Sequence, residues 1–228
     1  YRQKTADEYG VICLQLFHFY HIDPAAVQAA VIASVVPTVE PAVRTAVRDF
    51  LHINPLMVQP GLTTGLSIRY DHPEKLGSDR LANAVAAYTL YGGPVIIVDL
   101  GTATKLCVVT ARGEYLGGII APGIKALTEI LTKTADKLPR FEPVKPPKVV
   151  GTNTVACMQS GIIYGQIAML SGLIRRIKSE LGLPAVKVVA TGGLADLVAP
   201  EIPAINTVNP LLTLEGLRII YEMNPSFS

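Results

Sequence analysis

Residues 94–110 read PVIIVDLGTATKLCVVT, an apolar run that stops at Asp99 and is followed by the turn Gly101-Thr102. The run from Pro94 to Leu100 is typical of a fully buried strand. The segment from Lys105 to Thr110 has the length and composition of its hairpin partner. This stretch therefore predicts two antiparallel strands joined by a tight turn of small residues.

The chain after this hairpin completes a recognisable pattern. An Arg112-Gly113 turn leads to a third expected strand from Tyr115 to Ala121. A long helical pattern follows from Thr154 to Leu181, and a further strand is expected from Val186 to Ala190. Three antiparallel strands followed by helix and strand give a β-β-β-α-β order, which differs from a classical Rossmann unit and predicts an α/β fold.

The chain before the hairpin predicts an additional lobe. Apolar spacing and capping signals predict helices at residues 5–20, 39–51 and 78–91, and short strands at residues 31–36 and 66–70. A last helix is expected at residues 213–223. We therefore expect a first lobe of residues 1–93, on which the C-terminal segment 211–228 packs, and a second lobe of residues 94–210.

Composition narrows the class of protein. The chain has 228 residues, of which 50% are hydrophobic and 17% charged, as in a compact α/β enzyme. Its net charge of +2 is spread along the sequence, so no nucleic-acid footprint is expected. No run of about 18 apolar residues and no leader pattern are visible, which favours a cytoplasmic protein without a membrane partner. Three cysteines without C-x-x-C spacing are interpreted as reduced core thiols.

Small-residue turns beside apolar strands are candidate phosphate sites. Polyphosphate needs backbone N–H groups and hydroxyls at close approach, which only small residues allow. Thr102 and Thr104 would supply hydroxyls, and Asp99 could hold a cation. Each turn taken alone is better explained as an ordinary hairpin turn, but three of them at strand ends together favour phosphate binding. The three segments are Asp99–Thr104, Gly117-Gly118 with Pro122-Gly123, and Thr191-Gly192-Gly193.

A carboxylate and a guanidinium stand side by side in Gly77-Ser78-Asp79-Arg80, at an expected helix start. A carboxylate can accept the proton of an acceptor hydroxyl during phosphoryl transfer, and Arg can clamp an anionic group. A helix cap with a surface ion pair is the competing interpretation. Tyr70, just upstream, could hydrogen-bond a polar substrate or belong to the core.

With these residues in hand, the chain resembles the type III pantothenate kinases of the acetate kinase/Hsp70/actin-like superfamily. The resemblance implies two lobes of duplicated ribonuclease H-like topology, with the active site in the cleft between them. The ordered matches cover nearly the whole chain. They are Thr5–Glu8, Ser34–Pro37, Gly77–Arg80, Asp99–Thr104, Gly117-Gly118 through Pro122-Gly123, Asn153-Thr154 to Gln159-Ser160-Gly161, Thr191–Gly193 and Leu212–Leu217.

The resemblance also implies roles for individual residues. Asp79 would be the proton acceptor and Asp99 the ligand of a monovalent cation, K⁺ or NH₄⁺. ATP and Mg²⁺ are the implied cofactors, and a homodimer is the implied assembly. The implied pantothenate site consists of Tyr70, Gly77, Ser78, Asp79, Arg80 and Thr154. The implied ATP site consists of Gly101, Thr102, Thr104, Gly192 and Gly193.

Two departures from the family pattern are visible. Family members begin with an Asp-x-Gly-Asn-Thr phosphate loop on the first strand, whereas this chain starts at Tyr1-Arg2-Gln3-Lys4, a segment expected after the first hairpin. The first strands of lobe one are therefore expected to be missing. Lys105 stands where a hydroxyl residue is expected after Thr104, so it either helps phosphate binding or is solvated.

The expected activity is ATP-dependent phosphorylation of pantothenate to 4'-phosphopantothenate, the first step of coenzyme A biosynthesis. Two alternatives stay open. One is a kinase for another small hydroxylated acceptor, such as a sugar or acetate. The other is a non-catalytic regulatory or binding relative of the same family.

Overall fold

The computed structural model describes residues 4–134 and 138–225. The chain divides into two compact units, which are described separately. The first unit comprises Tyr1–Gly65, Asp71–Ala86 and Thr213–Ser228, and the second comprises Leu66–Tyr70 and Ala87–Leu212. The last three residues of the predicted C-terminal segment 211–228 lie outside the described residues.

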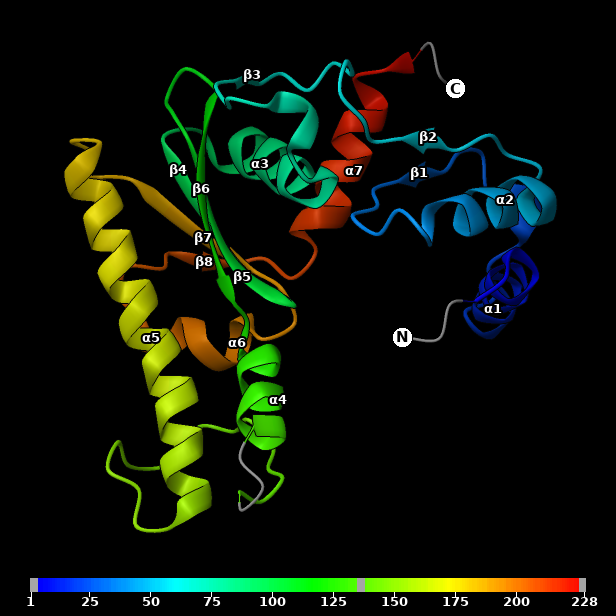
Figure 1. Cartoon of the computed structure of the whole chain (residues 1–228). Coiled ribbons are helices and arrows are strands. Elements are labelled where there is room, and N and C mark those ends of the chain that lie inside the picture. Colours follow the sequence, from blue (N-terminus) through cyan, green and yellow to red (C-terminus); the bar gives the residue numbers. More distant parts are fainter. Residues whose placement is uncertain (1–3, 135–137, 226–228) are drawn as a thin grey trace. The chain divides into compact units, whose positions relative to one another are not determined.

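The second unit is built on a six-stranded mixed sheet of order β3-β6-β5-β4-β7-β8 (Figure 1). Strands β4, β5 and β6 are antiparallel neighbours, whereas β7 runs parallel to β4. This arrangement confirms the predicted α/β class and β-β-β-α-β order. The strands are β3 (Ser67–Ile68), β4 (Val95–Leu100), β5 (Ala103–Val109), β6 (Glu114–Pro122), β7 (Lys187–Thr191) and β8 (Thr207–Val208).

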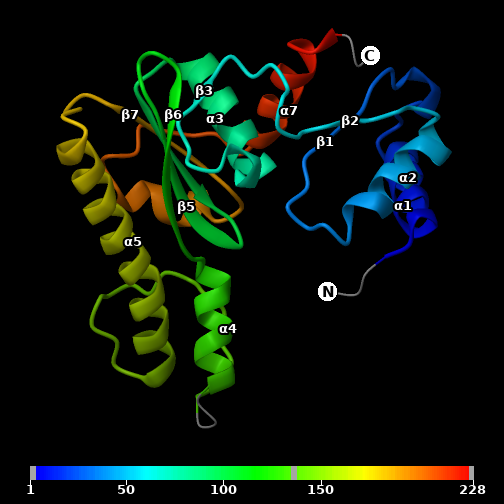
Figure 2. The same ribbon diagram turned by 45° about the horizontal axis from the view of Figure 1, so that its top comes forward.

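Helix α5 (Thr154–Glu180) packs against this sheet, as Figures 1 and 2 both show. Its side chains at helical spacing, including Ile163, Leu170 and Ile174, join Ile96 and Val98 of β4 in one buried core. The helix is long and apolar enough to cross a membrane by length and composition alone. The packing of α5 into the core of the second unit equally explains why the helix is so apolar.

Shorter elements complete the second unit. Helix α4 (Ile124–Thr134) continues from the end of β6, and Asn153 caps α5 by accepting a hydrogen bond from the Ala156 N–H at 2.9 Å. Helix α6 (Ala195–Val198) and a 3-10 turn (Ala199–Glu201) follow β7. Helix α4 and the edge strand β8 were not among the predicted elements.

The first unit contains helices α1 (Ala6–Phe19) and α2 (Glu40–Leu51), whose packing is close. A Cβ atom on Gly10 of α1 would overlap the ring of Phe50 in α2. The predicted capping signal is confirmed, because Thr5 and Glu8 form a reciprocal capping box at the start of α1. Strands β1 (Val31–Ile32) and β2 (Leu56–Met57) pair in parallel, and 3-10 turns cover Pro24–Ala26 and Pro73–Lys75.

Helices α3 (Ser78–Tyr91) and α7 (Leu212–Glu222) meet in the first unit. A Cβ atom on Gly216 would overlap the backbone of Ala82, so α7 needs glycine at this contact. The Thr213 hydroxyl donates a hydrogen bond of 2.7 Å to the side-chain carbonyl oxygen of buried Asn83. The glycine of the Leu212–Leu217 motif is thus explained by helix packing.

Two expectations differ from the structure. The strand predicted over residues 31–36 ends at Ile32, because the Ser34 hydroxyl bonds to the Val36 backbone and turns the chain. The cysteines do not all lie in a core: Cys107 is buried and Cys13 half-buried, but Cys157 is exposed at the start of α5. Of its apolar neighbours, Met158 is buried, whereas Val155 and Ala156 are only half-buried.

Candidate functional site

Asp79 lies in the first turn of α3, where backbone N–H groups favour a negative charge. Its Oδ1 atom accepts a hydrogen bond of 2.8 Å from the Arg80 backbone N–H. A Cβ atom on Gly77 would lie 2.7 Å from that oxygen, so a side chain at residue 77 would displace the carboxylate. Asp79 is half-buried and Arg80 is buried. The segment therefore holds an oriented carboxylate at the start of a helix.

Ser78 ties this segment to the Ser34–Pro37 loop. The Ser78 side chain is 8% exposed, and its hydroxyl donates to the Ser34 carbonyl oxygen at 3.0 Å. Ser78 is therefore an anchor of the loop, and its hydroxyl is engaged within the protein. This contact joins two of the motifs that carry the family resemblance.

A cavity of about 490 Å³ opens beside the same segment in the first unit. It is lined by residues from 34–40, 58–60 and 74–78, which include the polar side chains of Glu40, Gln59 and Lys75. Ligand sites are usually concave and carry a few convergent polar groups. Gly77 and Ser78 were predicted to line a substrate site and do line this cavity. Gln59 and Lys75 were missed, because loop residues without a motif carry no sequence signal.

In the second unit, the turn after β7 approaches the end of β4 closely. Gly192 has a φ of +95°, and a Cβ atom there would lie 2.6 Å from the carbonyl carbon of Leu100. The Leu194 N–H donates to the Leu100 carbonyl oxygen at 3.3 Å. Gly193 is exposed, and a Cβ atom there would meet no atom of the described chain within 4 Å. Glycine is needed at residue 192 because the backbone of Leu100 lies against it, whereas the described chain leaves space for a side chain at residue 193.

The Gly101-Thr102 turn meets the start of α4 at the same end of the sheet. A Cβ atom on Gly123 would overlap the Thr102 carbonyl oxygen, and Ala103 is the register partner of Pro122. Thr102 is exposed. Residues 101–102, 122–123 and 192–193 are therefore neighbours at the end of β4. Small residues and backbone N–H groups gathered in this way can accommodate phosphate.

Gly117 and Gly118 do not belong to this cluster. They lie inside β6, where Gly118 pairs with Cys107 and the register shifts at Val109. Gly117 has a φ of +111°, as expected at a β-bulge. Since a strand advances about 3.3 Å per residue, Gly118 lies about 13 Å from Pro122 along β6. The prediction that grouped these two glycines with Pro122-Gly123 is therefore wrong.

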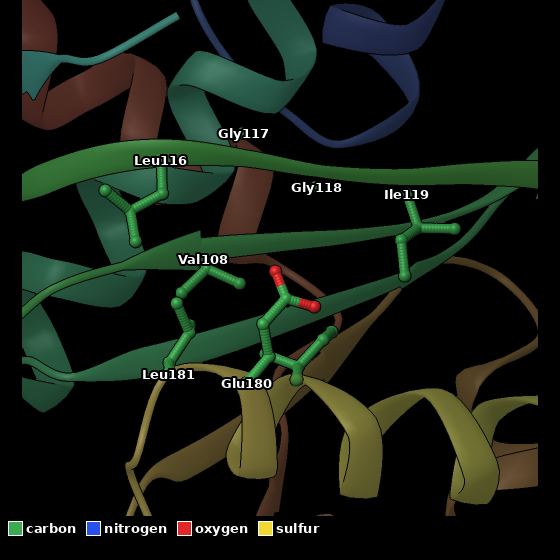
Figure 3. Close-up of a pocket in the computed structure, with 8 residues that line it drawn as sticks. Val108, Leu116, Gly117, Gly118, Ile119, Glu180 and Leu181 are labelled. Atoms are coloured by element: carbon green, nitrogen blue, oxygen red, sulfur yellow. The ribbon is translucent and has the colours of Figure 1, made fainter.

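The bulge instead borders a small cavity of about 190 Å³ between β6 and the end of α5 (Figure 3). Its lining is mostly apolar, and the Glu180 carboxylate points toward the strands in Figure 3. A Cβ atom on Gly118 would overlap the Leu106 carbonyl oxygen. The glycine at residue 118 is thus explained by close strand packing.

Thr104 is only 1% exposed, and its hydroxyl donates to the Oε1 atom of Gln166 at 3.0 Å. Gln166 in turn donates through Nε2 to the Pro122 carbonyl oxygen at 3.1 Å. This chain of hydrogen bonds fastens α5 to the start of β5 and to the end of β6. It differs from the expectation that the Thr104 hydroxyl faces phosphate. Gln166 was missed, although a polar residue on the otherwise apolar face of α5 was its signal.

Asp99 and Lys105 are register partners on β4 and β5. Lys105 Nζ lies 3.0 Å from Asp99 Oδ2, and the two side chains are 17% and 15% exposed. Lys105 is therefore not a solvated residue. An ammonium group already occupies one carboxylate oxygen of Asp99, so this pair does not fit an additional monovalent cation at that oxygen. Within the described residues, no group of three or more His, Cys, Asp or Glu side chains could hold a metal ion.

Tyr70 follows β3 and packs on β6. Its ring lies edge-on to Tyr115 with centroids 6.3 Å apart, and a Cβ atom on Gly117 would meet the Tyr70 ring at 3.4 Å. Tyr70 thus has a packing role in the second unit.

The neighbouring Arg69 guanidinium donates a hydrogen bond of 3.1 Å to the Glu114 carboxylate and lowers the pKa of that carboxyl group.

Thr154 is exposed at the first position of α5. Gln166, which contacts Thr104, lies twelve residues further along this helix. At a rise of 1.5 Å per residue, Thr154 is about 18 Å along the helix axis from Gln166. Thr154 and Gln166 are therefore more than three helical turns apart on α5.

Comparison with known proteins identifies the family. The model of the type III pantothenate kinase family matches residues 1–176. A type III pantothenate kinase of Moorella thermoacetica is 52% identical over 98% of this chain and 87% of its own length. The corresponding protein of Myxococcus xanthus is 49% identical over 97% of this chain and 86% of its own length.

Solved structures share the fold at lower identity. A protein from Campylobacter jejuni described as a Baf family transcriptional activator superposes with a TM-score of 0.63 at 20% identity, covering 92% of this chain and 89% of its own. The ethanolamine utilization protein EutJ from Carboxydothermus hydrogenoformans gives 0.54 at 16% identity, covering 94% and 74%. The family match and the close relatives confirm the resemblance inferred from the motifs. The chain belongs to the type III pantothenate kinase family.

Proposed function

We propose that this protein transfers the γ-phosphoryl group of ATP to the primary hydroxyl of pantothenate, forming 4'-phosphopantothenate for coenzyme A biosynthesis. The observation that carries the proposal is the identity of about half of the residues with type III pantothenate kinases over nearly the whole chain. The oriented carboxylate of Asp79 and the glycine cluster at the end of β4 support it, because the reaction needs a proton acceptor and a phosphate-binding backbone.

Asp79 is the proposed base. The hydrogen bond from the Arg80 N–H orients one oxygen of its carboxylate. As the bond between the hydroxyl oxygen and the γ-phosphorus forms and the bond from that phosphorus to the bridging oxygen of ADP breaks, the carboxylate accepts the hydroxyl proton and ADP leaves. Pantothenate contacts are proposed for Tyr70, Arg80, Thr154 and the cavity residues Gly77 and Ser78. Arg80 is the proposed partner of the pantothenate carboxylate, since guanidinium and carboxylate match in bidentate geometry.

The proposed ATP site is the turn cluster at the end of β4. Gly101, Thr102, Gly192 and Gly193 would contact phosphate through backbone N–H groups and the exposed Thr102 hydroxyl. For Thr104 we propose an indirect role, because its hydroxyl holds Gln166. Mg²⁺ would arrive with ATP, held largely by phosphate oxygens and water, where it neutralises charge.

The test of the base is Asp79→Asn. We expect kcat for pantothenate phosphorylation to fall by about 10²–10⁴-fold. Asp7→Asn is the matched control, because Asp7 is also a carboxylate in the first turn of a helix but is exposed on α1. Its kcat should equal that of the wild type. Unchanged activity of Asp79→Asn, with circular dichroism showing a folded protein, would remove Asp79 from the mechanism.

Substrate choice is tested with a panel of acceptors. Radiolabelled ATP should label pantothenate, with sugars and acetate labelled at background level. Preferred labelling of a sugar or acetate would point to another acceptor, and absence of any labelling would favour a binding or regulatory relative. The fold shared with the Baf family protein at 20% identity does not favour that alternative by itself.

We further propose a cytoplasmic homodimer that pairs through α5. The three cysteines are free, as expected in a reducing compartment. On α5, Cβ atoms on Gly161, Gly165 and Gly172 would meet no atom of the described chain within 4 Å, which leaves room for a second helix. A second chain could also bring Thr154 to a substrate. Gly165→Leu should shift the protein to monomer in sedimentation analysis, and an unchanged dimer would contradict this interface.

A further inference from the structure

The Asp99 carboxylate lies directly beside the proposed phosphate turn. A Cβ atom on Gly101 would be 3.3 Å from Asp99 Oδ1, and the other oxygen, Oδ2, bonds Lys105 Nζ at 3.0 Å. A carboxylate at this place would repel phosphate if its charge were not compensated. Lys105 supplies that compensation from the neighbouring strand, since the two residues are register partners.

The Asp99–Lys105 pair is largely shielded from water, so the attraction between its two charges is strong. With side chains 15% and 17% exposed, the two charges are screened far less by water than a surface pair. An ammonium group carries the same charge as K⁺ or NH₄⁺ and donates hydrogen bonds to carboxylate oxygen. A further cation beside Nζ would be repelled at short range. The geometry thus places an internal cation where an external one was expected.

We propose that Lys105 acts as a tethered monovalent cation: its Nζ neutralises Asp99, so that nucleotide binding at the Gly101-Thr102 turn does not depend on added K⁺ or NH₄⁺. This rests on the ATP site proposed above. Lys105 is accordingly a positioning residue. It neutralises the Asp99 carboxylate beside the phosphate turn and holds the ends of β4 and β5 in register.

The test measures binding of MgATP to the full-length protein by isothermal titration calorimetry, without pantothenate. Two buffers of equal ionic strength contain either K⁺ or tetramethylammonium, which is too large to replace K⁺. We expect the wild-type Kd to differ by less than about twofold between them. In Lys105→Gln, binding in tetramethylammonium should weaken by about tenfold or more, and K⁺ or NH₄⁺ should restore it.

Lys133→Gln is the matched control. Lys133 also pairs with a carboxylate, Glu129, but its side chain is 76% exposed on α4. Its MgATP affinity should equal that of the wild type in both buffers. If Lys105→Gln does not fold, the wild-type comparison decides alone: equal affinity in both buffers supports the proposal.

Three results would overturn the inference. Wild-type binding that requires K⁺ would show that Lys105 does not replace the cation. Equal binding of Lys105→Gln in both buffers would show that no cation is needed. Weakened binding that neither K⁺ nor NH₄⁺ restores would assign Lys105 a direct phosphate contact. Absence of MgATP binding in either buffer would also refute the ATP site, whereas failure to phosphorylate pantothenate would leave this inference intact.

Discussion

Adjacent glycines after β7 should respond very differently to the same substitution. Gly192→Ala introduces a methyl group 2.6 Å from the carbonyl carbon of Leu100, at a φ of +95°. Strain from that φ costs about 1–3 kcal/mol, and overpacking costs about 1–3 kcal/mol more. Gly193→Ala meets no atom of the described chain within 4 Å and is the matched control.

The expected loss of about 2–6 kcal/mol corresponds to a fall in Tm of at least about 4 °C for a protein of this size. Thermal unfolding followed by circular dichroism measures it for both variants. Gly193→Ala should melt like the wild type but bind MgATP more weakly, because its methyl group enters the space proposed for phosphate. A Gly192→Ala protein that melts within a degree of the wild type, or equal destabilisation by both substitutions, would refute the reasoning.

The core and the edge of the sheet offer two further tests. Leu170→Ala removes a side chain that is 0% exposed in the core of the second unit, and should lower the free energy of unfolding by about 2–5 kcal/mol in urea titrations. Leu211→Ala, at a side chain 56% exposed, should change it little, and equal losses would contradict the assigned core. The Arg69 hydrogen bond lowers the pKa of Glu114, so this pair stabilises the fold above the usual glutamate pKa of about 4.3 and less as the pH falls through the lowered value. Arg69→Ala should therefore lower the urea midpoint at pH 7 and converge with the wild type in acid; a constant difference at every pH would argue against this linkage.

Local sequence patterns foretold much of the fold. The apolar run before Asp99 and the hairpin after it appear as β4 and β5, and the capping box at Thr5 starts α1. These features depend on neighbouring residues, whose periodicity and hydrogen bonding are visible in the sequence. Helix α4 was not foreseen, and the strand expected at residues 31–36 was too long. The hydrogen bonds between Ser34 and Val36 shorten the strand, whereas the helical spacing of Ile124, Leu127 and Leu131 in α4 agrees with the structure and was missed.

The candidate site, too, was only partly predictable from the sequence. The Gly77–Arg80 and Asp99–Thr104 motifs were visible as chemistry, and their order along the chain pointed to the family that the comparisons confirm. Their sequence could not tell whether a glycine serves a ligand or the protein's own backbone. Gly192 serves the approach to Leu100, and Gly118 serves strand packing, whereas a Cβ atom on Gly193 would have room.

Residue types, strand and helix periods, and family motifs are properties of the chain, and they sufficed for the α/β class and for naming Asp79 and Asp99. The contacts that the site residues make within the folded protein are not properties of the local sequence. Thr104 meets Gln166, 62 residues away, and Lys105 closes onto Asp99 inside a shielded hairpin. The Asp99–Lys105 pairing depends on the register of the β4–β5 hairpin, and the Thr104–Gln166 pairing exists only once α5 packs on the sheet.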